Sequence, residues 1–212
     1  MDACVSPGMV ARTIHEGGSS DILDKIHSPG CAAAIWQRRL APELQERLDT
    51  IEPQFLPEAR IELEADRVAE ALDVVFGGCG LTRSDALRTM LTADVVGIAR
   101  LFARIVGTTS LRLRLDVVDD NACTKFHQDN VPVRLLCSYR GRGTEYGLCR
   151  QGEIPSTIHE MARGAVALFR GQLWPSSETI GLAHRSPQIL GLGETRLMLV
   201  IDPLGEIASK RM

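Results

Sequence analysis

The chain has 212 residues and a mass of 23.2 kDa, which suits one domain, with or without a helical extension, and excludes a large multidomain assembly. Hydrophobic residues make up 44% and charged residues 24%, a balance typical of globular rather than disordered chains. The net charge of -3 and the pI near 6.0 argue against nucleic acid or an acidic membrane as a partner, because such binders concentrate positive charge on one face.

The apolar stretches are too short to cross a membrane. Residues 95–99 are typical of the longest runs, whereas a span requires roughly 18 apolar residues. Residues 1–20 contain acids and glycines without a continuous apolar run, so no signal peptide is indicated and we expect a cytoplasmic protein. The six cysteines are scattered without a CxxC pair, which predicts free thiols rather than disulfides or a zinc knuckle.

The first half of the chain divides into a leader and a helical region. Residues 1–30 are rich in Gly, Ser, Pro and Asp, which predicts a flexible leader. Residues 31–109 form the predicted helical region. Short helices are expected there over residues 31–40 and 42–51, the second with Pro42 at its first helical position.

Two longer helices are expected next. Over residues 61–76 apolar side chains recur at spacings of three and four, opposite a charged face, and a pair of glycines closes the pattern. Thr82 and Asp85 resemble a capping box, behind which a second apolar stripe of helical period runs to Gly107. The two stripes indicate that something is buried against these helices, which could be a lid, a dimer interface or a brace for a sheet.

From residue 110 the hydrophobic period changes from helical to two, because Leu111, Leu113 and Leu115 alternate with charged residues. Residues 110–212 are therefore predicted to be β-structure and to carry the metal site. Eight short strands are expected, over residues 111–118, 125–129, 133–139, 144–149, 156–159, 165–169, 179–184 and 196–201. The pattern predicts an α+β fold, with the N-terminal helices packed on a double-stranded β-helix, the cupin-like jelly roll, as one compact unit.

The strongest local signal for chemistry is the HxD pair of His127 and Asp129. On a strand both side chains point to the same face, with Cα atoms roughly 7 Å apart, and can converge on one metal ion. His184, at the end of a later predicted strand, is the candidate third ligand. Two histidines and one carboxylate form the facial triad of mononuclear iron(II) oxygenases. The alternative is that the histidines are hydrogen-bonded structural groups in an interaction module.

The layout of residues 110–203 resembles the iron(II)- and 2-oxoglutarate-dependent dioxygenases. Their pattern is HxD, a set of strands, a distal histidine and, about ten residues later, an arginine. The resemblance implies Fe(II) and 2-oxoglutarate as cofactors, His127, Asp129 and His184 as metal ligands, and Arg196 as the partner of the cosubstrate carboxylate. The fork of a guanidinium suits that role, since it matches two carboxylate oxygens in one plane. The alternative for Arg196 is a surface arginine at the start of a strand.

A longer set of motifs resembles the bacterial family DUF1826 over most of the chain. The motifs lie at residues 126–129 (FHQD), 134–145 (RLLCSYRGRGTE), 168–171 (LFRG) and 184–187 (HRSP). The resemblance implies a family without a settled reaction, whose genes often lie near those of zinc-responsive metallochaperone GTPases. It therefore implies a link to metal homeostasis and keeps zinc open as the metal.

Three more residues are candidates around this site. Arg134 and Tyr139 are five residues apart on the strand that follows the HxD pair, so at most one of them points into the barrel. Either could bind the cosubstrate, Tyr139 by donating a hydrogen bond to a carboxylate, although a core tyrosine is equally consistent. Cys123 is a candidate soft ligand that would favour zinc over iron, or else a buried free thiol.

Together these patterns favour a mononuclear metal-binding jelly-roll protein. The leading hypothesis is an oxidoreductase of the Fe(II)/2-oxoglutarate-dependent dioxygenase type, acting on a small-molecule or peptide substrate. The second is a zinc-binding protein of metal homeostasis or a zinc-dependent hydrolase, for which Glu145 and Glu153 are the nearest candidate bases. Signatures of serine hydrolases, nucleotide-binding loops and HExxH proteases are missing from the sequence.

Overall fold

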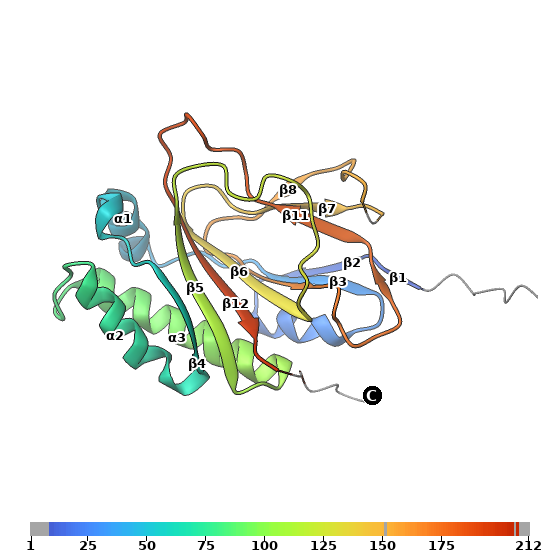
Figure 1. Cartoon of the computed structure of the whole chain (residues 1–212), viewed down its shortest axis with the longest axis horizontal. Coiled ribbons are helices and arrows are strands. Elements are labelled where there is room, and N and C mark those ends of the chain that lie inside the picture. Colours follow the sequence, from blue (N-terminus) through green and yellow to red (C-terminus); the bar gives the residue numbers. More distant parts are fainter. Residues whose placement is uncertain (1–8, 151, 206, 208–212) are drawn as a thin grey trace, which may run out of the picture.

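The computed structural model of the chain describes residues 9–150, 152–205 and 207. A seven-stranded sheet in the order β2-β3-β9-β6-β12-β5-β4 carries α-helices on one face and a three-stranded sheet, β11-β7-β8, on the other (Figure 1). The strands of the larger sheet are β2 (Thr13–Gly17), β3 (Cys31–Trp36), β4 (Ala59–Glu64), β5 (Ser110–Val118), β6 (Val133–Arg140), β9 (Val166–Arg170) and β12 (Arg196–Pro203). Those of the smaller sheet are β7 (Glu145–Leu148), β8 (His159–Glu160) and β11 (Leu182–Arg185), and a parallel pair joins β1 (Val10–Ala11) to β10 (Thr179–Ile180). The expected α+β jelly roll is confirmed.

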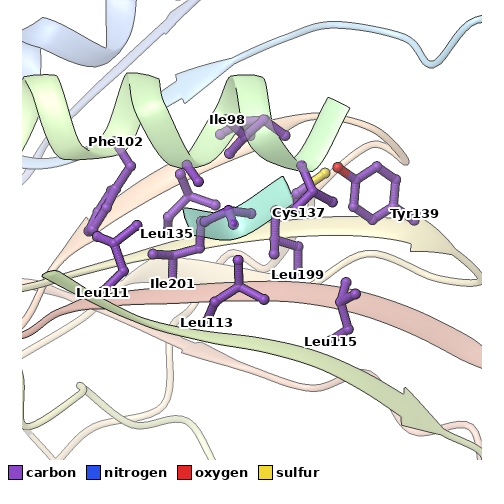
Figure 2. Close-up of a cluster of buried hydrophobic side chains, with 14 of the residues drawn as sticks. Ile98, Phe102, Leu111, Leu113, Leu115, Leu135, Cys137, Tyr139, Leu199 and Ile201 are labelled. Atoms are coloured by element: carbon purple, nitrogen blue, oxygen red, sulfur yellow. The ribbon is translucent and has the colours of Figure 1, made fainter. Parts of the chain in front are cut away.

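Each strand of the larger sheet has one face towards the helices and one towards the smaller sheet. On β5, Leu111, Leu113 and Leu115 are fully buried on the helix side, and the charged residues between them lie on the other side. Figure 2 shows this helix-side core, in which Ile98 and Phe102 pack against side chains of β5, β6 and β12. A second apolar cluster fills the space between the two sheets. The sheet is therefore shared by two cores.

Three α-helices cover the sheet, and two of them match the expected ones closely. These helices are α1 (Pro42–Thr50), α2 (Val68–Gly78) and α3 (Ala86–Val106). The side chain of Asp85 caps α3 by accepting a hydrogen bond from the backbone N–H of Leu87 at 2.8 Å. The helix ends at Gly107, whose φ of 68° is the left-handed conformation that glycine adopts most easily. Among the described residues no helix is both long and apolar enough to cross a bilayer.

The prediction of a flexible leader over residues 1–30 is wrong for the part that the structure describes. Residues 9–30 contain β1, β2 and a 3-10 helix, η1 (Ser20–His27). Leu23 and Ile26 of η1 are fully buried, because their spacing of three residues places both on the face that packs against β3. The glycine and serine content that indicated a leader belongs to the turns around these elements. Residues 1–8 lie outside the described part.

Two predicted helical stretches contain strands instead. Residues 31–40 begin with β3, whose first five residues are all buried, so the segment has no polar alternation that would distinguish a strand from a helix. Residues 61–64 belong to β4, and α2 begins only at Val68. Residues 125–129 form no strand, since their only ladder contact is the bridge between His127 and His184. The remaining predicted strands are present, some of them shorter than expected.

A polar cluster ties α3 to the sheet within the helix-side core. Arg38 donates two hydrogen bonds to the carboxylate of Asp94 on α3, at 2.6 and 2.7 Å. The hydroxyl of Tyr139 on β6 donates to the same carboxylate at 2.6 Å, and Arg38 also donates to the carbonyl of Gly164 at 2.8 Å. One carboxylate thus satisfies the buried ends of two side chains.

Removal of this carboxylate should destabilise the fold. Asp94→Ala leaves a largely buried guanidinium and a buried hydroxyl without an acceptor, so we expect the free energy of unfolding to fall by about 3 kcal/mol. Tyr139→Phe should cost only about 1 kcal/mol. Urea unfolding followed by circular dichroism measures both. Arg47→Ala, which breaks an exposed pair with Glu43, is the control and should cost less than about 0.5 kcal/mol. An Asp94→Ala cost no larger than the control would contradict the role of the cluster.

Candidate metal centre

Three side chains from distant parts of the chain meet between the two sheets. One ligand atom each from His127, Asp129 and His184 lies within 4.8 Å of the other two. Nε2 of His127 is 3.7 Å from Oδ1 of Asp129, and Nε2 of His184 is 3.2 Å from Oδ2 of the same carboxylate. Among the described residues this is the one such group of histidine, cysteine or acidic side chains. The structure therefore brings together the three residues that the sequence pattern selected.

Contacts around the two histidines orient both rings and, for His127, decide which nitrogen faces the cluster. Nδ1 of His127 is 2.9 Å from the carbonyl oxygen of Lys125, which can only accept, so Nδ1 carries the proton and Nε2 is left with a free lone pair. His184 stacks on Phe169, with ring centroids 5.0 Å apart. The two histidines also exchange backbone hydrogen bonds of 3.0 Å in both directions. The pair is thus oriented by backbone and ring contacts alone.

Asp129 is buried and is held from the sheet side by Arg134. Arg134 contacts Oδ1 of Asp129 and makes two hydrogen bonds to Asp202 on β12, at 2.7 and 2.8 Å. Burial alone would raise the pKa of Asp129, but the approach of both histidines and the charge of Arg134 lower it well below its usual value. The carboxylate is therefore ionised. The side chain of Arg134, proposed from the sequence as a cofactor contact, lines the pocket. Its N–H groups bind the carboxylates of Asp129 and Asp202.

The free atoms of this cluster fit a divalent cation. Oδ2 of Asp129 is buried and has no hydrogen-bond partner of good geometry among the described residues. An ionised oxygen left in this state is costly unless a cation or donor meets it. Together with two imidazole nitrogens it forms a donor set that suits iron(II) and zinc alike. Cys123 does not join it, because its sulfur lies 3.5 Å from Nδ1 of His127, the nitrogen that faces Lys125.

A glycine lets the loop that carries Asp129 lie against the sheet. Gly171 follows β9, and a Cβ atom there would be 2.0 Å from the carbonyl oxygen of Val131. Its N–H donates to the carbonyl of Pro132 at 2.9 Å, and the next N–H donates to that of Asp129 at 2.9 Å. Any side chain at this position would push the loop away from the sheet. This explains the glycine of the LFRG motif.

A cavity of about 190 Å³ opens beside the three side chains. Its walls include His127, Arg134, Thr144, His184, Met198 and Val200. Met198 and Val200 belong to β12, on the face that looks towards the smaller sheet. The cavity is therefore part polar, where the cluster lies, and part apolar.

Arg196 is fully buried on the same face of β12 as Met198. Its Nε donates to the carbonyl oxygen of Arg142 at 2.8 Å, and its Nη2 lies 2.7 Å from the sulfur of Met198. No carboxylate of the described residues lies within salt-bridge distance of its guanidinium, and burial lowers the pKa of Arg196 to about 10. The alternative of a surface arginine is wrong, since the side chain is fully buried, and the nearby carboxylates of Glu194, Glu160 and Glu145 form no ion pair with it.

Two hydroxyl groups near Arg196 were missed in the sequence. Thr144 is buried and lines the cavity. Ser138 is opposite Met198 in the β6–β12 ladder, and its buried hydroxyl has no hydrogen-bond partner among the residues described. Asp202 was also missed, although the period of two along β12 places it on the same face as Arg196. The same alternation along β6 relates Ser138 to Arg134.

Tyr139 does not lie at this site. It is fully buried on the helix side of β6, and its hydroxyl donates to Asp94. Figure 2 shows the ring among the side chains that face α3. The expected hydrogen bond from Tyr139 to a bound carboxylate is therefore excluded by its position on the opposite face of the sheet. The turn after β6 contains Gly141 with φ of 73°, a left-handed conformation that favours glycine, and it presents the Arg142 carbonyl to Arg196.

Sequence comparison identifies the family. The family described as "Protein of unknown function (DUF1826)" matches residues 17–202. The chain belongs to the DUF1826 family. This confirms the resemblance carried by the FHQD, LFRG and HRSP motifs. A search of curated proteins finds no match to this DUF1826 chain.

The fold of this DUF1826 chain is similar to that of two plant dioxygenases. One is dioxygenase for auxin oxidation 1 from Arabidopsis thaliana, in a binary complex with 2-oxoglutarate, with 10% identity and a TM-score of 0.54 over 93% of each chain. The other is the dioxygenase for auxin oxidation from rice, with 12% identity and a TM-score of 0.53 over 91% of this chain and 83% of that one. At such identities the likeness shows a shared dioxygenase-like fold alone.

Asp202 should control metal affinity through Arg134. In Asp202→Asn the guanidinium loses its charged bidentate partner and no longer holds Asp129 in one orientation, so binding of Mn(II) should weaken about 10–100-fold while the fold is retained. Competition with a fluorescent chelator measures the affinity. Glu62→Gln, which removes a carboxylate from the exposed pair with Arg112, is the matched control and should change nothing. Wild-type affinity in Asp202→Asn would show that Arg134 needs no such support.

Proposed function

We propose that this protein is a mononuclear Fe(II)- and 2-oxoglutarate-dependent oxidoreductase of the dioxygenase type. The observation that carries the proposal is a two-histidine, one-carboxylate cluster beside a cavity, together with a buried arginine that has no ion pair among the described residues and contacts Met198 of the cavity wall. His127, Asp129 and His184 would hold the metal. Arg196 would bind the distal carboxylate of the cosubstrate. A dioxygenase-like fold around the pocket supports this combination.

The donor set supports a metal that keeps open positions. Three ligands on one side of an ion leave the other side for a chelating cosubstrate and for oxygen. When bound, Fe(II) with 2-oxoglutarate supplies the activation of molecular oxygen for oxidation of a C–H bond. The protein itself would orient the three ligands, and Arg134, supported by Asp202, would hold the carboxylate of Asp129.

The base of the pocket supports binding of a dicarboxylate. The guanidinium of Arg196 can make a bidentate pair with a carboxylate, which would supply its missing counter-ion. The hydroxyl of Thr144 lines the cavity, that of Ser138 lies on the same sheet face opposite Met198, and both can donate further hydrogen bonds. Leu136, Met198 and Val200 form an apolar wall that excludes water and strengthens these contacts.

A zinc-dependent hydrolase has less support. Such an enzyme needs a general base near the metal-bound water. Glu145, one of the two acids considered from the sequence, is held by Arg185 at 2.6 Å and by Arg142 at 3.3 Å, and Glu153 is exposed and absent from the walls of the cavity. Zinc itself remains an outcome of the metal analysis below.

Arg196 gives the sharpest test. Protein purified anaerobically from cells supplied with both metals should contain near-stoichiometric iron, which His127→Ala and Asp129→Ala should lose. Calorimetry of the Mn(II)-loaded protein should show 2-oxoglutarate binding that weakens at least about tenfold in Arg196→Gln, because a charge-assisted pair is lost. Arg104→Gln, which removes an exposed arginine from α3, is the control and should bind normally.

The outcomes separate the hypotheses. Release of succinate from 2-oxoglutarate by the iron-loaded protein supports the proposal. Bound zinc that both ligand variants lose, with no affinity for 2-oxoglutarate, would favour metal homeostasis instead. A wild-type protein that takes up neither metal would leave the histidines as structural groups.

A further inference from the structure

The charged residues on the pocket face of β4, β5 and β12 are arranged in two neighbouring rows. In the first row Glu62 is opposite Arg112, Arg112 is opposite Asp202, and Asp202 is bound by Arg134. Signs alternate along this row, and each arginine has a carboxylate partner, as the pair of Arg112 and Glu62 at 2.7 Å illustrates. Its charges are therefore balanced within the protein.

The second row, two residues along each strand, is not balanced. Here Arg60 of β4 is directly opposite Arg114 of β5, Arg114 is opposite Val200, and Val200 is opposite Leu136. The Cβ atoms of directly opposite residues lie about 5 Å apart, and like charges in such a pair destabilise the sheet. We call Arg60, Arg114, Val200 and Leu136 the arginine row.

The charges near the arginine row leave it with excess positive charge. Arg60 has no ion pair within 4.0 Å among the described residues, and the only carboxylate near Arg114 is Asp116 at 3.6 Å. Glu62, the other acid on this part of β4, is taken by Arg112. Arg114 thus has one carboxylate neighbour and Arg60 has none within that distance in the described part of the chain.

The arginine row leads directly into the candidate metal centre. Arg114, Val200 and Leu136 all line the cavity that holds His127 and His184. Two strand spacings, about 10 Å, separate the backbone of Arg114 from that of Leu136. A molecule on this row would meet positive charge at its outer end and apolar side chains at the end beside the metal ligands.

We propose that Arg60 and Arg114 bind the anionic group of a substrate whose apolar part lies over Val200 and Leu136. The substrate class is a small organic acid, a carboxylate or a phosphate monoester, with an apolar body. The inference rests on the proposed function for the reaction, since the apolar end would be the part presented to the metal. The anion site itself follows from the strand register and the excess of positive charge at Arg60 and Arg114.

The test uses probes that differ only in charge. Calorimetry of the Mn(II)- and 2-oxoglutarate-loaded protein compares aryl and alkyl carboxylates and phosphate monoesters, beginning with 3-phenylpropanoate and phenyl phosphate, with neutral amides such as 3-phenylpropanamide. At least one acid should bind about tenfold or more tightly than its neutral counterpart, because charge-assisted hydrogen bonds to a guanidinium are stronger than neutral ones. The better acid series identifies the anionic group.

Variants locate the binding. Arg114→Gln, and the double variant with Arg60→Gln, should reduce the affinity of the acids to that of the amides, while metal content and 2-oxoglutarate affinity stay at wild-type values. Arg112→Gln removes the same charge from the same face of the same strand, within the balanced row, and should leave acid binding unchanged. Thermal unfolding confirms that all three variants are folded.

Four outcomes decide the matter. Preference for acids that depends on Arg114 and not on Arg112 supports the inference. No preference in any acid series, or equal losses in Arg112→Gln and Arg114→Gln, overturns it while metal and 2-oxoglutarate binding leave the proposed function standing. Arg114-dependent binding of acids by a protein that binds no 2-oxoglutarate would support the anion site and overturn the proposed function.

Discussion

The period of two along the strands of the larger sheet is the constraint on which both the core and the candidate site depend. On β5 and β12 every second side chain is apolar and meets the helices, and the residues between them face the pocket. A shift of one residue in register would turn Arg114 and Arg196 into the helix-side core. The long ladders of β12 with β5 and β6 prevent this and hold the arginines in fixed positions.

Buried arginines in this protein fall into two kinds. Arg38, Arg134 and Arg170 each meet a carboxylate within 2.7 Å, so their charges are compensated inside the fold. Arg196 meets only a carbonyl oxygen and a sulfur, although it is the most completely buried of the set. Because an uncompensated buried charge costs several kcal/mol, this contrast supports the proposal that a ligand carboxylate pairs with Arg196.

Local patterns predicted α3 and most of the strands after it, and missed β3 and β4, which precede it. The alternation of β5 and the helical period and cap of α3 could be read directly, whereas the alanine-rich β3 is buried on both faces and carries no alternation. The HxD spacing and the distal histidine predicted the cluster. The pairing of Arg134 with Asp202 depends on which strands are neighbours in the sheet. The position of the Tyr139 side chain depends on which face of β6 packs against the helices. Neither could be predicted from the local sequence.

Contacts within the protein orient all three side chains of the cluster. His127 lies outside any strand, yet two backbone hydrogen bonds to His184 place it as firmly as a ladder would. Asp129 is held through Arg134, and His184 stacks on Phe169. In small domains whose metal ligands come together only when the metal binds, the free energy of metal binding drives folding. In this larger domain the three side chains are held by backbone hydrogen bonds, by Arg134 and by Phe169, and two apolar cores stabilise the sheet, so we do not expect folding to depend on a metal.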